Sequence, residues 1–175
     1  MDHIKAVPTP IEIVVDSIAD GYSSLLQRLC ECARLRREYS SDLELASVAD
    51  AVMRALSEGS SISVGPVKVE MRRKLLGKSM KVELWGKEVS PDELLAKISQ
   101  ARSRAAWLQS DCSDQAVMEP VYASNDREAI EFAMRNLAEL AKICDGATPN
   151  LDLSNLPEYV VAGIKRGLEK YINKK

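Results

Sequence analysis

The spacing of apolar residues changes along this chain, and that change limits what it can fold into. In five segments, apolar residues recur in steps of three and four, which places one stripe on an α-helix. Between Ile62 and Leu84 they alternate with polar residues, the period of a strand buried on one face. The sequence therefore predicts a mainly α fold with one β insertion.

The first helical segment begins at Thr9-Pro10, a hydroxyl cap followed by proline at the first helical position, and reaches about Glu38. Gly21 lies inside it and is expected to weaken or bend the helix. Its apolar stripe consists of Ile11, Val15, Ile18, Tyr22, Leu25, Leu29 and Cys32. The same spacing fits a coiled-coil seam, although it is more typical of a bundle element.

Four further helical segments are expected at 41–59, 90–108, 125–146 and 154–172, from capping residues at their starts and glycine stops at two of their ends. The second is predicted to begin with a reciprocal cap between Ser41 and Glu44, and the fourth with Asn125 and Glu128. Residues 110–124 are predicted to be a loop, because Pro120 is expected to prevent a helix there.

The alternating segment is predicted to be an antiparallel β-hairpin. Val67, Val69 and Met71 alternate on one side of a short turn at 76–78, and a second alternating run follows it. Gly65-Pro66 is expected to mark a bulge or the start of the first strand. Because a lone hairpin is marginal in water, its apolar face must lie on the helices or on a partner.

Together these segments predict a five-helix bundle with one inserted antiparallel β-hairpin, in the order α-α-β-β-α-α-α. The expected organisation is a single domain, 1–175, in which 9–58 and 90–172 form the bundle and 61–86 the hairpin. At 175 residues and 46% hydrophobic composition, such a chain can bury a sufficient core.

No catalytic, cofactor-binding or metal-binding constellation is evident, so an enzyme is not expected. The one histidine, His3, lies near the N-terminus, which leaves nucleophile schemes without a base. Gly77-Lys78-Ser79 lacks the upstream glycine of a phosphate loop and no helix pattern follows it. Three loop acids, Asp111, Asp114 and Glu119, could serve a hydrolase or hold magnesium, but their expected role is solvation.

The cysteines and the N-terminal sequence bear on the cellular compartment in which the protein is expected. Of the four cysteines, only Cys30 and Cys32 are close in sequence, and C-x-C is not a usual zinc spacing. They are expected to be plain thiols, with a disulfide left open for a hyperthermophile. No membrane-spanning run is present, and Met1 to Pro10 lacks the layout of a signal peptide. These features predict a cytoplasmic protein without membrane contact.

Charge is concentrated in the hairpin. From Lys68 to Lys87, seven basic and two acidic residues leave a net charge of +5, whereas the whole chain carries −2. Alternation places Lys68, Arg72 and Lys74 on one face, away from the apolar residues. The candidate nucleic-acid-binding residues are Lys68, Arg72, Arg73, Lys74, Lys78 and Lys81. Trp85 is either a base-stacking residue or, more commonly for its kind, part of the core or rim.

Three interpretations of the cationic cluster are open: sequence-independent contact with RNA or DNA backbone, a solvated edge that prevents aggregation, and docking to an acidic protein. The function favoured is a non-catalytic small helical subunit of a larger nucleoprotein assembly. Its general character is similar to that of small helical subunits of CRISPR effector complexes, although no motif of that family is present. The alternative is a protein-binding adaptor or virion-type structural protein that assembles, or self-associates, through the stripe from Ile11 to Cys32.

Overall fold

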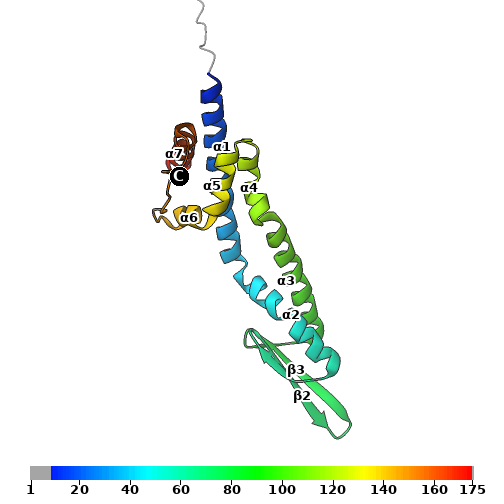
Figure 1. The fold of residues 1–175 in the computed structure, drawn as a ribbon. Helices are drawn as coiled ribbons and strands as arrows, with labels where there is room; N and C mark the ends of the chain where they lie inside the picture. Colours follow the sequence, from blue (N-terminus) through cyan, green and yellow to red (C-terminus); the bar gives the residue numbers. More distant parts are fainter. Residues whose placement is uncertain (1–8, 175) are drawn as a thin grey trace, which may run out of the picture. The chain divides into compact units, whose positions relative to one another are not determined.

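The structure is a computed structural model that describes residues 9–174, so His3 and most of the N-terminal segment considered above lie outside the described residues. The chain divides into two compact units (Figure 1). One, here called the disulfide unit, comprises the residues up to Arg34 and those from Asp111 onward. The other, the hairpin unit, is Leu35–Ser110.

The predicted fold class is confirmed: the chain is mainly helical, with antiparallel strands inserted after two helices. The two helices before the strands are α1 (Pro10–Glu38) and α2 (Ser40–Glu58), and α3 (Pro91–Asp111) follows the strands. The predicted single domain with its subdivision at 61–86 stays a prediction.

Local capping signals account for two of these helix starts. At α1, Thr9 Oγ1 accepts from the Glu12 amide at 3.2 Å, and the Glu12 carboxylate accepts from the Thr9 amide at 3.1 Å. At α3, Ser90 Oγ accepts from the Glu93 amide at 3.1 Å. Both caps were predicted. The predicted cap at Ser41 is wrong, because α2 already begins at Ser40 and only Tyr39 separates it from α1.

The β insertion is larger than one hairpin. Strands β1 (Ile62–Val64), β2 (Val67–Lys74), β3 (Gly77–Leu84) and β4 (Lys87–Val89) form an antiparallel sheet in that order. Gly65, with φ +52°, allows a tight turn between β1 and β2, where the sequence suggested a bulge or a strand start. The predicted hairpin is thus the central pair of a four-stranded sheet.

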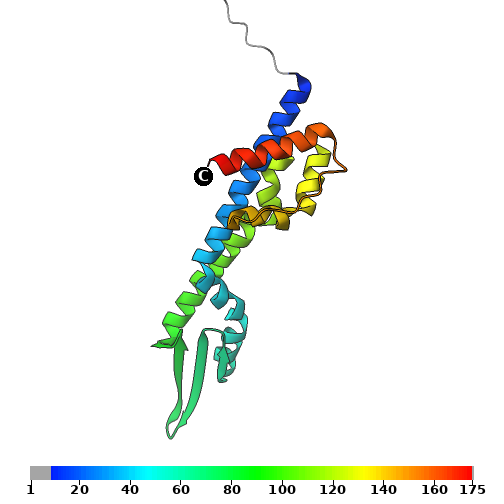
Figure 2. The same cartoon turned by 90° about the vertical axis from the view of Figure 1, so that its left-hand side faces the viewer.

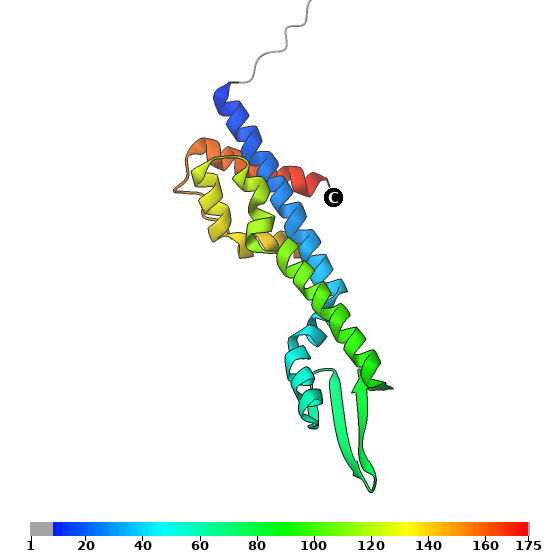
Figure 3. The same ribbon diagram turned by 90° about the vertical axis from the view of Figure 1, so that its right-hand side faces the viewer.

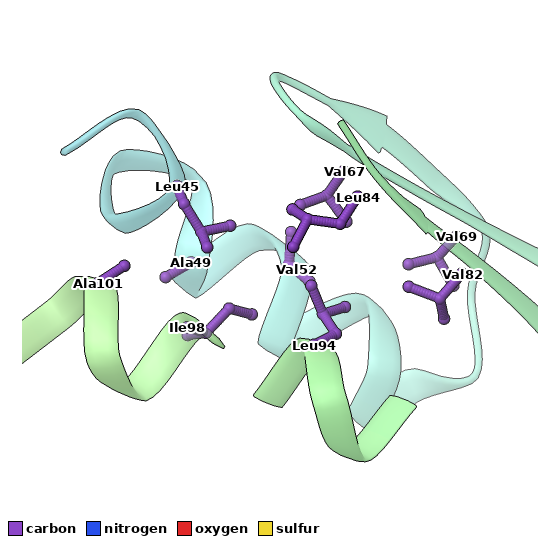
Figure 4. Packing of buried hydrophobic residues seen from close by; sticks show 10 residues of the cluster. All are labelled: Leu45, Ala49, Val52, Val67, Val69, Val82, Leu84, Leu94, Ile98 and Ala101. Carbon is purple, nitrogen blue, oxygen red and sulfur yellow. The ribbon is translucent and has the colours of Figure 1, made fainter. Parts of the chain in front are cut away.

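The core of the hairpin unit lies between this sheet and the two helices on its inner face. Figure 4 shows Val67 and Leu84 of the sheet facing Val52 of α2 and Leu94 of α3. Further along the sheet, Val69 and Val82 are also fully buried. The requirement that the apolar face of the hairpin pack on helices is therefore met within this unit.

The disulfide unit contains the remaining elements: α4 (Asp114–Tyr122), α5 (Arg127–Arg135), α6 (Leu137–Ala141), the 3₁₀ helix η1 (Lys142–Asp145) and α7 (Glu158–Asn173). The single helix predicted at 125–146 is broken at Asn136, whose side-chain amide donates to the Phe132 carbonyl at 2.8 Å. Asp126, rather than Asn125, caps α5 by accepting from the Ala129 amide. Gly146 ends η1 in the left-handed conformation, as expected.

Two disulfides fasten α1 to the rest of this unit. Cys30 is bonded to Cys144 in η1 and Cys32 to Cys112 at the α3–α4 junction, with Cα–Cα distances of 5.1 and 5.7 Å. The expectation of plain thiols is wrong. The predicted cytoplasmic location is contradicted as well, because a reducing cytoplasm keeps thiols reduced, and the bridges indicate an oxidising environment such as an extracellular or secreted one.

Helix α4 occupies much of the segment predicted to be a loop, and it contains Pro120. Ser113 Oγ caps it by accepting from the Ala116 amide at 3.1 Å. Proline removes one helical donor, and the Arg28 guanidinium replaces it by donating to the Ala116 carbonyl at 2.7 Å. The prediction failed because this compensation comes from another helix.

Glycines let three helices of the disulfide unit approach closely. A Cβ on Gly21 would lie 2.9 Å from the Pro120 carbonyl oxygen of α4, and one on Gly167 of α7 would lie 2.6 Å from the Ala19 carbonyl oxygen of α1. Gly163, one turn before Gly167, meets Ile18 in the same way, so α7 crosses α1 at its glycine face (Figure 3). Gly21 therefore serves packing, and α1 continues unbroken past it.

Candidate functional site

The register of the central hairpin assigns each side chain to a face. Val67 pairs with Leu84, Val69 with Val82 and Met71 with Met80, and these pairs form the inner face. Continuing outward on this face, the next pair is Arg73 with Lys78. The other face carries Lys68 opposite Glu83, Glu70 opposite Lys81 and Arg72 opposite Ser79. The six predicted binding residues therefore divide between the two faces.

The part of the hairpin nearest the helices, here called the shaft (residues 67–71 and 79–84), is electrically neutral. It holds two basic residues, Lys68 and Lys81, and two acidic ones, Glu70 and Glu83. The Lys68 ammonium lies 3.0 Å from the Glu70 carboxylate, and Lys81 lies 3.6 Å from Glu83. Hydrogen bonding from Lys68 and Arg72 holds the pKa of Glu70 below its usual value. The cations of the shaft are thus paired with its own acids.

The distal end of the hairpin, here called the cationic tip (residues 72–78), has the opposite character. Its four basic residues and no acidic ones give it all of the net +4 charge of residues 67–84. Arg72 reaches back to Glu70 at 3.3 Å. Within residues 9–174, no carboxylate forms an ion pair with Arg73, Lys74 or Lys78. The positive charge is therefore concentrated at one end.

Arg73 and Lys78 are directly opposite each other across the strands. Like charges in this position repel and destabilise the pair. Both residues are exposed, so water screens the repulsion without removing it. An anion bound between the two side chains, or just beyond them, would attract both cations and offset the repulsion between them.

Two leucines form the turn of the tip. Leu75 and Leu76 connect β2 to β3, and their relative exposures are 106% and 102%. Such turns usually contain glycine, asparagine or aspartate, so adjacent leucines are unusual there. Neither leucine was among the predicted binding residues, although two apolar residues in a predicted turn between basic strands are a recognisable signal.

The tip extends beyond the helices of its own unit (Figures 1 and 2). Met71 and Met80 form the last pair that packs against the core cluster. At a rise of about 3.3 Å per residue, Lys74 lies roughly 10 Å further out. The exposed leucines therefore project ahead of the cations, and the cations ahead of the neutral shaft.

Other candidate residues are located elsewhere. Trp85 is in the turn between β3 and β4, at the opposite end of the hairpin, half-exposed and with φ +52°. Of the three acids predicted to be in a loop, Asp114 is in the first turn of α4 and Glu119 pairs with Arg28 at 3.1 Å. Among the described residues, no group of three potential metal ligands is present.

Much of the stripe proposed for self-association lies in a core. Val15, Ile18, Tyr22 and Leu25 are buried, whereas Ile11 is 65% exposed. Association through this stripe stays a prediction. In the described part of the chain, no helix combines the length and apolarity needed to cross a bilayer.

Comparison of the chain with protein-family models, with curated protein sequences and with solved structures finds no match.

Proposed function

We propose that this chain is a non-catalytic binding protein whose cationic tip docks on a surface bearing phosphodiester groups. The observation that carries the proposal is the separation of charge along the hairpin: a neutral shaft and a tip with a net charge of +4. Cations on a two-stranded ribbon that form no ion pair with another described residue are suited to phosphate oxygens.

The form predicted from the sequence is contact with RNA or DNA backbone inside a nucleoprotein assembly. The tip supports a limited version of that prediction, because only three of its four cations lack an ion pair with another described residue. Three phosphate contacts give modest affinity, without any reading of sequence. The phosphodiesters of lipid headgroups offer the same chemistry, so both surfaces belong in the test.

The test compares a tip variant with a matched control. Arg73→Ala/Lys74→Ala/Lys78→Ala removes the cations without an ion pair, whereas Arg54→Ala/Lys97→Ala/Lys165→Ala removes three exposed cations outside the sheet. Binding to fluorescent single-stranded and duplex oligonucleotides, and to phosphatidylglycerol-containing vesicles, is measured at several salt concentrations.

We expect the native protein and the control variant to bind at low salt, and the tip variant to bind at least one of these surfaces much more weakly. For a duplex, losing three phosphate contacts makes the negative slope of log affinity against log salt less steep by about 3. Equal binding by both variants, or no binding of the native protein to any surface at low salt, would overturn the proposal.

A further inference from the structure

We infer that the surface is an anionic lipid membrane, with Leu75 and Leu76 inserted at the acyl boundary and the tip cations on the headgroup phosphates. This inference depends on the proposed function and names its partner. It is carried by the positions of the two leucines relative to the charges.

The two leucine side chains have no apolar surroundings within the described residues. Their exposures of 106% and 102% show that their side chains make almost no contact within the described structure. Transferring a leucine side chain from water into an apolar environment is favourable, and a bilayer offers such an environment a few ångströms below its phosphates. The outer surface of a phosphodiester backbone does not.

The order of residues along the tip matches the layers of a membrane interface. Lys74 is next to Leu75, and the pair Arg73–Lys78 is one position further back. At about 3.3 Å per residue, these cations lie within roughly 7 Å of the turn. Interfacial elements bury their apolar side about 5–10 Å into the headgroup–acyl boundary, which leaves neighbouring cations at the phosphates.

The neutral shaft favours docking by the end of the hairpin. A strand lying along a polyanion would present basic residues over its whole length, but Lys68 and Lys81 are paired with Glu70 and Glu83. Within residues 67–84, only the turn and the two positions on each side of it combine cations that lack an ion pair with fully exposed apolar side chains. This arrangement suits a planar surface met end-on.

The disulfides bear on which membrane the tip would meet. Proteins that keep disulfides are found at cell surfaces, in secreted form or in oxidising compartments, so the anionic membrane would be one that faces such a compartment. Attraction of each tip cation to an anionic bilayer contributes about a fivefold gain in partitioning, and three contribute about a hundredfold. The resulting association is reversible and peripheral.

The test measures partitioning of the oxidised full chain to vesicles of phosphatidylcholine with and without phosphatidylglycerol. The leucine variant is Leu75→Ser/Leu76→Ser, and its matched control is Met134→Ser/Ile172→Ser, at two apolar sites that are 55% and 53% exposed. We expect the leucine variant to keep its thermal stability and to partition at least about tenfold more weakly to anionic vesicles. The control is expected to partition as the native protein does.

Insertion of the turn into the bilayer can be measured separately, by fluorescence quenching. Leu76→Trp places a fluorophore at the turn, and lipids brominated near the headgroup should quench it beyond the quenching of Trp85 and Trp107 in the native protein. A fluorophore that remains in water would show no additional quenching, and the inference would be wrong.

The outcomes separate this inference from the proposed function. If the tip cations matter for vesicles but the leucines do not, the function stands and the insertion is rejected. If the protein binds oligonucleotides but not anionic vesicles, the partner is a nucleic acid and the inference is overturned. If the native protein binds neither surface, the inference and the proposed function both fall.

Discussion

The guanidinium of Arg28 in α1 donates a 2.7 Å hydrogen bond to the Ala116 carbonyl, which is the acceptor that Pro120 leaves without a helical donor. A proline in a helix interior removes one such bond and usually kinks or ends the helix. Here Arg28, which lies 88 residues before Ala116 in the chain, supplies the missing donor. The same guanidinium lies 3.1 Å from Glu119, an exposed ion pair of little expected stability.

A double-mutant cycle tests this compensation. Arg28→Met is expected to destabilise the protein by about 1–2 kcal/mol, because the Ala116 carbonyl loses its donor. In a Pro120→Ala background the loss should be smaller, since the new amide at position 120 satisfies that carbonyl. Urea unfolding of the four proteins gives the coupling energy. Additive effects would show that Arg28 acts independently of the proline.

Replacing a glycine of α7 that contacts α1 with alanine is expected to destabilise the protein, the opposite of the usual effect in a helix. Gly→Ala in a helix normally stabilises by about 1 kcal/mol. Gly167→Ala is expected instead to destabilise by about 2 kcal/mol, because the new methyl meets the backbone of Ala19 and the Cβ of Tyr22. Ala162→Gly, at an exposed position of α7, measures the intrinsic propensity for comparison. A higher melting temperature for Gly167→Ala would contradict this packing.

Both disulfides should be needed for stability. They close long loops, with sequence separations of 114 and 80. The chain-entropy model assigns about 5 kcal/mol to each. We expect Cys30→Ser/Cys144→Ser and Cys32→Ser/Cys112→Ser each to lower the denaturant midpoint strongly, and reductant to do the same for the native chain. Thiol titration of the native protein under denaturing, non-reducing conditions should find no reactive thiol.

The buried Tyr22 is expected to make the folded protein less stable at alkaline pH. Its hydroxyl donates to the Ala129 carbonyl at 2.6 Å, and burial raises the pKa of the Tyr22 phenol. The unfolded chain releases this proton near pH 10 while the folded chain retains it. The contribution is therefore fully present below about pH 10 and is lost as the pH rises further. Tyr22→Phe should flatten this decline, measured by urea unfolding across alkaline pH, and an unchanged slope would refute the assignment.

Trp85 offers a stabilising substitution. With φ +52°, it adopts a left-handed conformation that a bulky residue rarely takes, beside Gly86 at φ +77°. Asn-Gly is the preferred pair where both turn residues have positive φ. Trp85→Asn is expected to raise the unfolding free energy by about 1 kcal/mol. A loss of stability would show that the packing of the half-exposed indole outweighs the backbone strain.

Local signals explain what the sequence could predict. The caps at Thr9 and Ser90 and the alternation from Val67 to Leu84 are patterns over a few residues, and the corresponding elements formed as expected. Helix α4 was missed because its proline is compensated by Arg28, far away in sequence. Strand β1 was included in the predicted hairpin segment but not separated from β2, and β4 was missed, because three residues are too few to establish a period.

The candidate site was only partly predictable for a similar reason. The excess of positive charge was visible in the sequence, but the pairing of Lys68 with Glu70 and of Lys81 with Glu83, which leaves the net charge on the tip, was not. The turn is at Leu75-Leu76, one residue earlier than predicted, which exposes both leucines. For the cysteines, side chains two apart on a helix point in different directions. This explains why Cys30 and Cys32 have separate partners, but the spacing does not identify them.

The two bridges also determine the fate of a cleaved chain. The cationic tip is exposed and basic, as protease sites often are, and a cut there would divide the polypeptide in two. Cys30–Cys144 and Cys32–Cys112 each join a residue before such a cut to one after it. A nicked molecule would therefore migrate as one species until reduced, so processing at the tip would go unseen on a non-reducing gel.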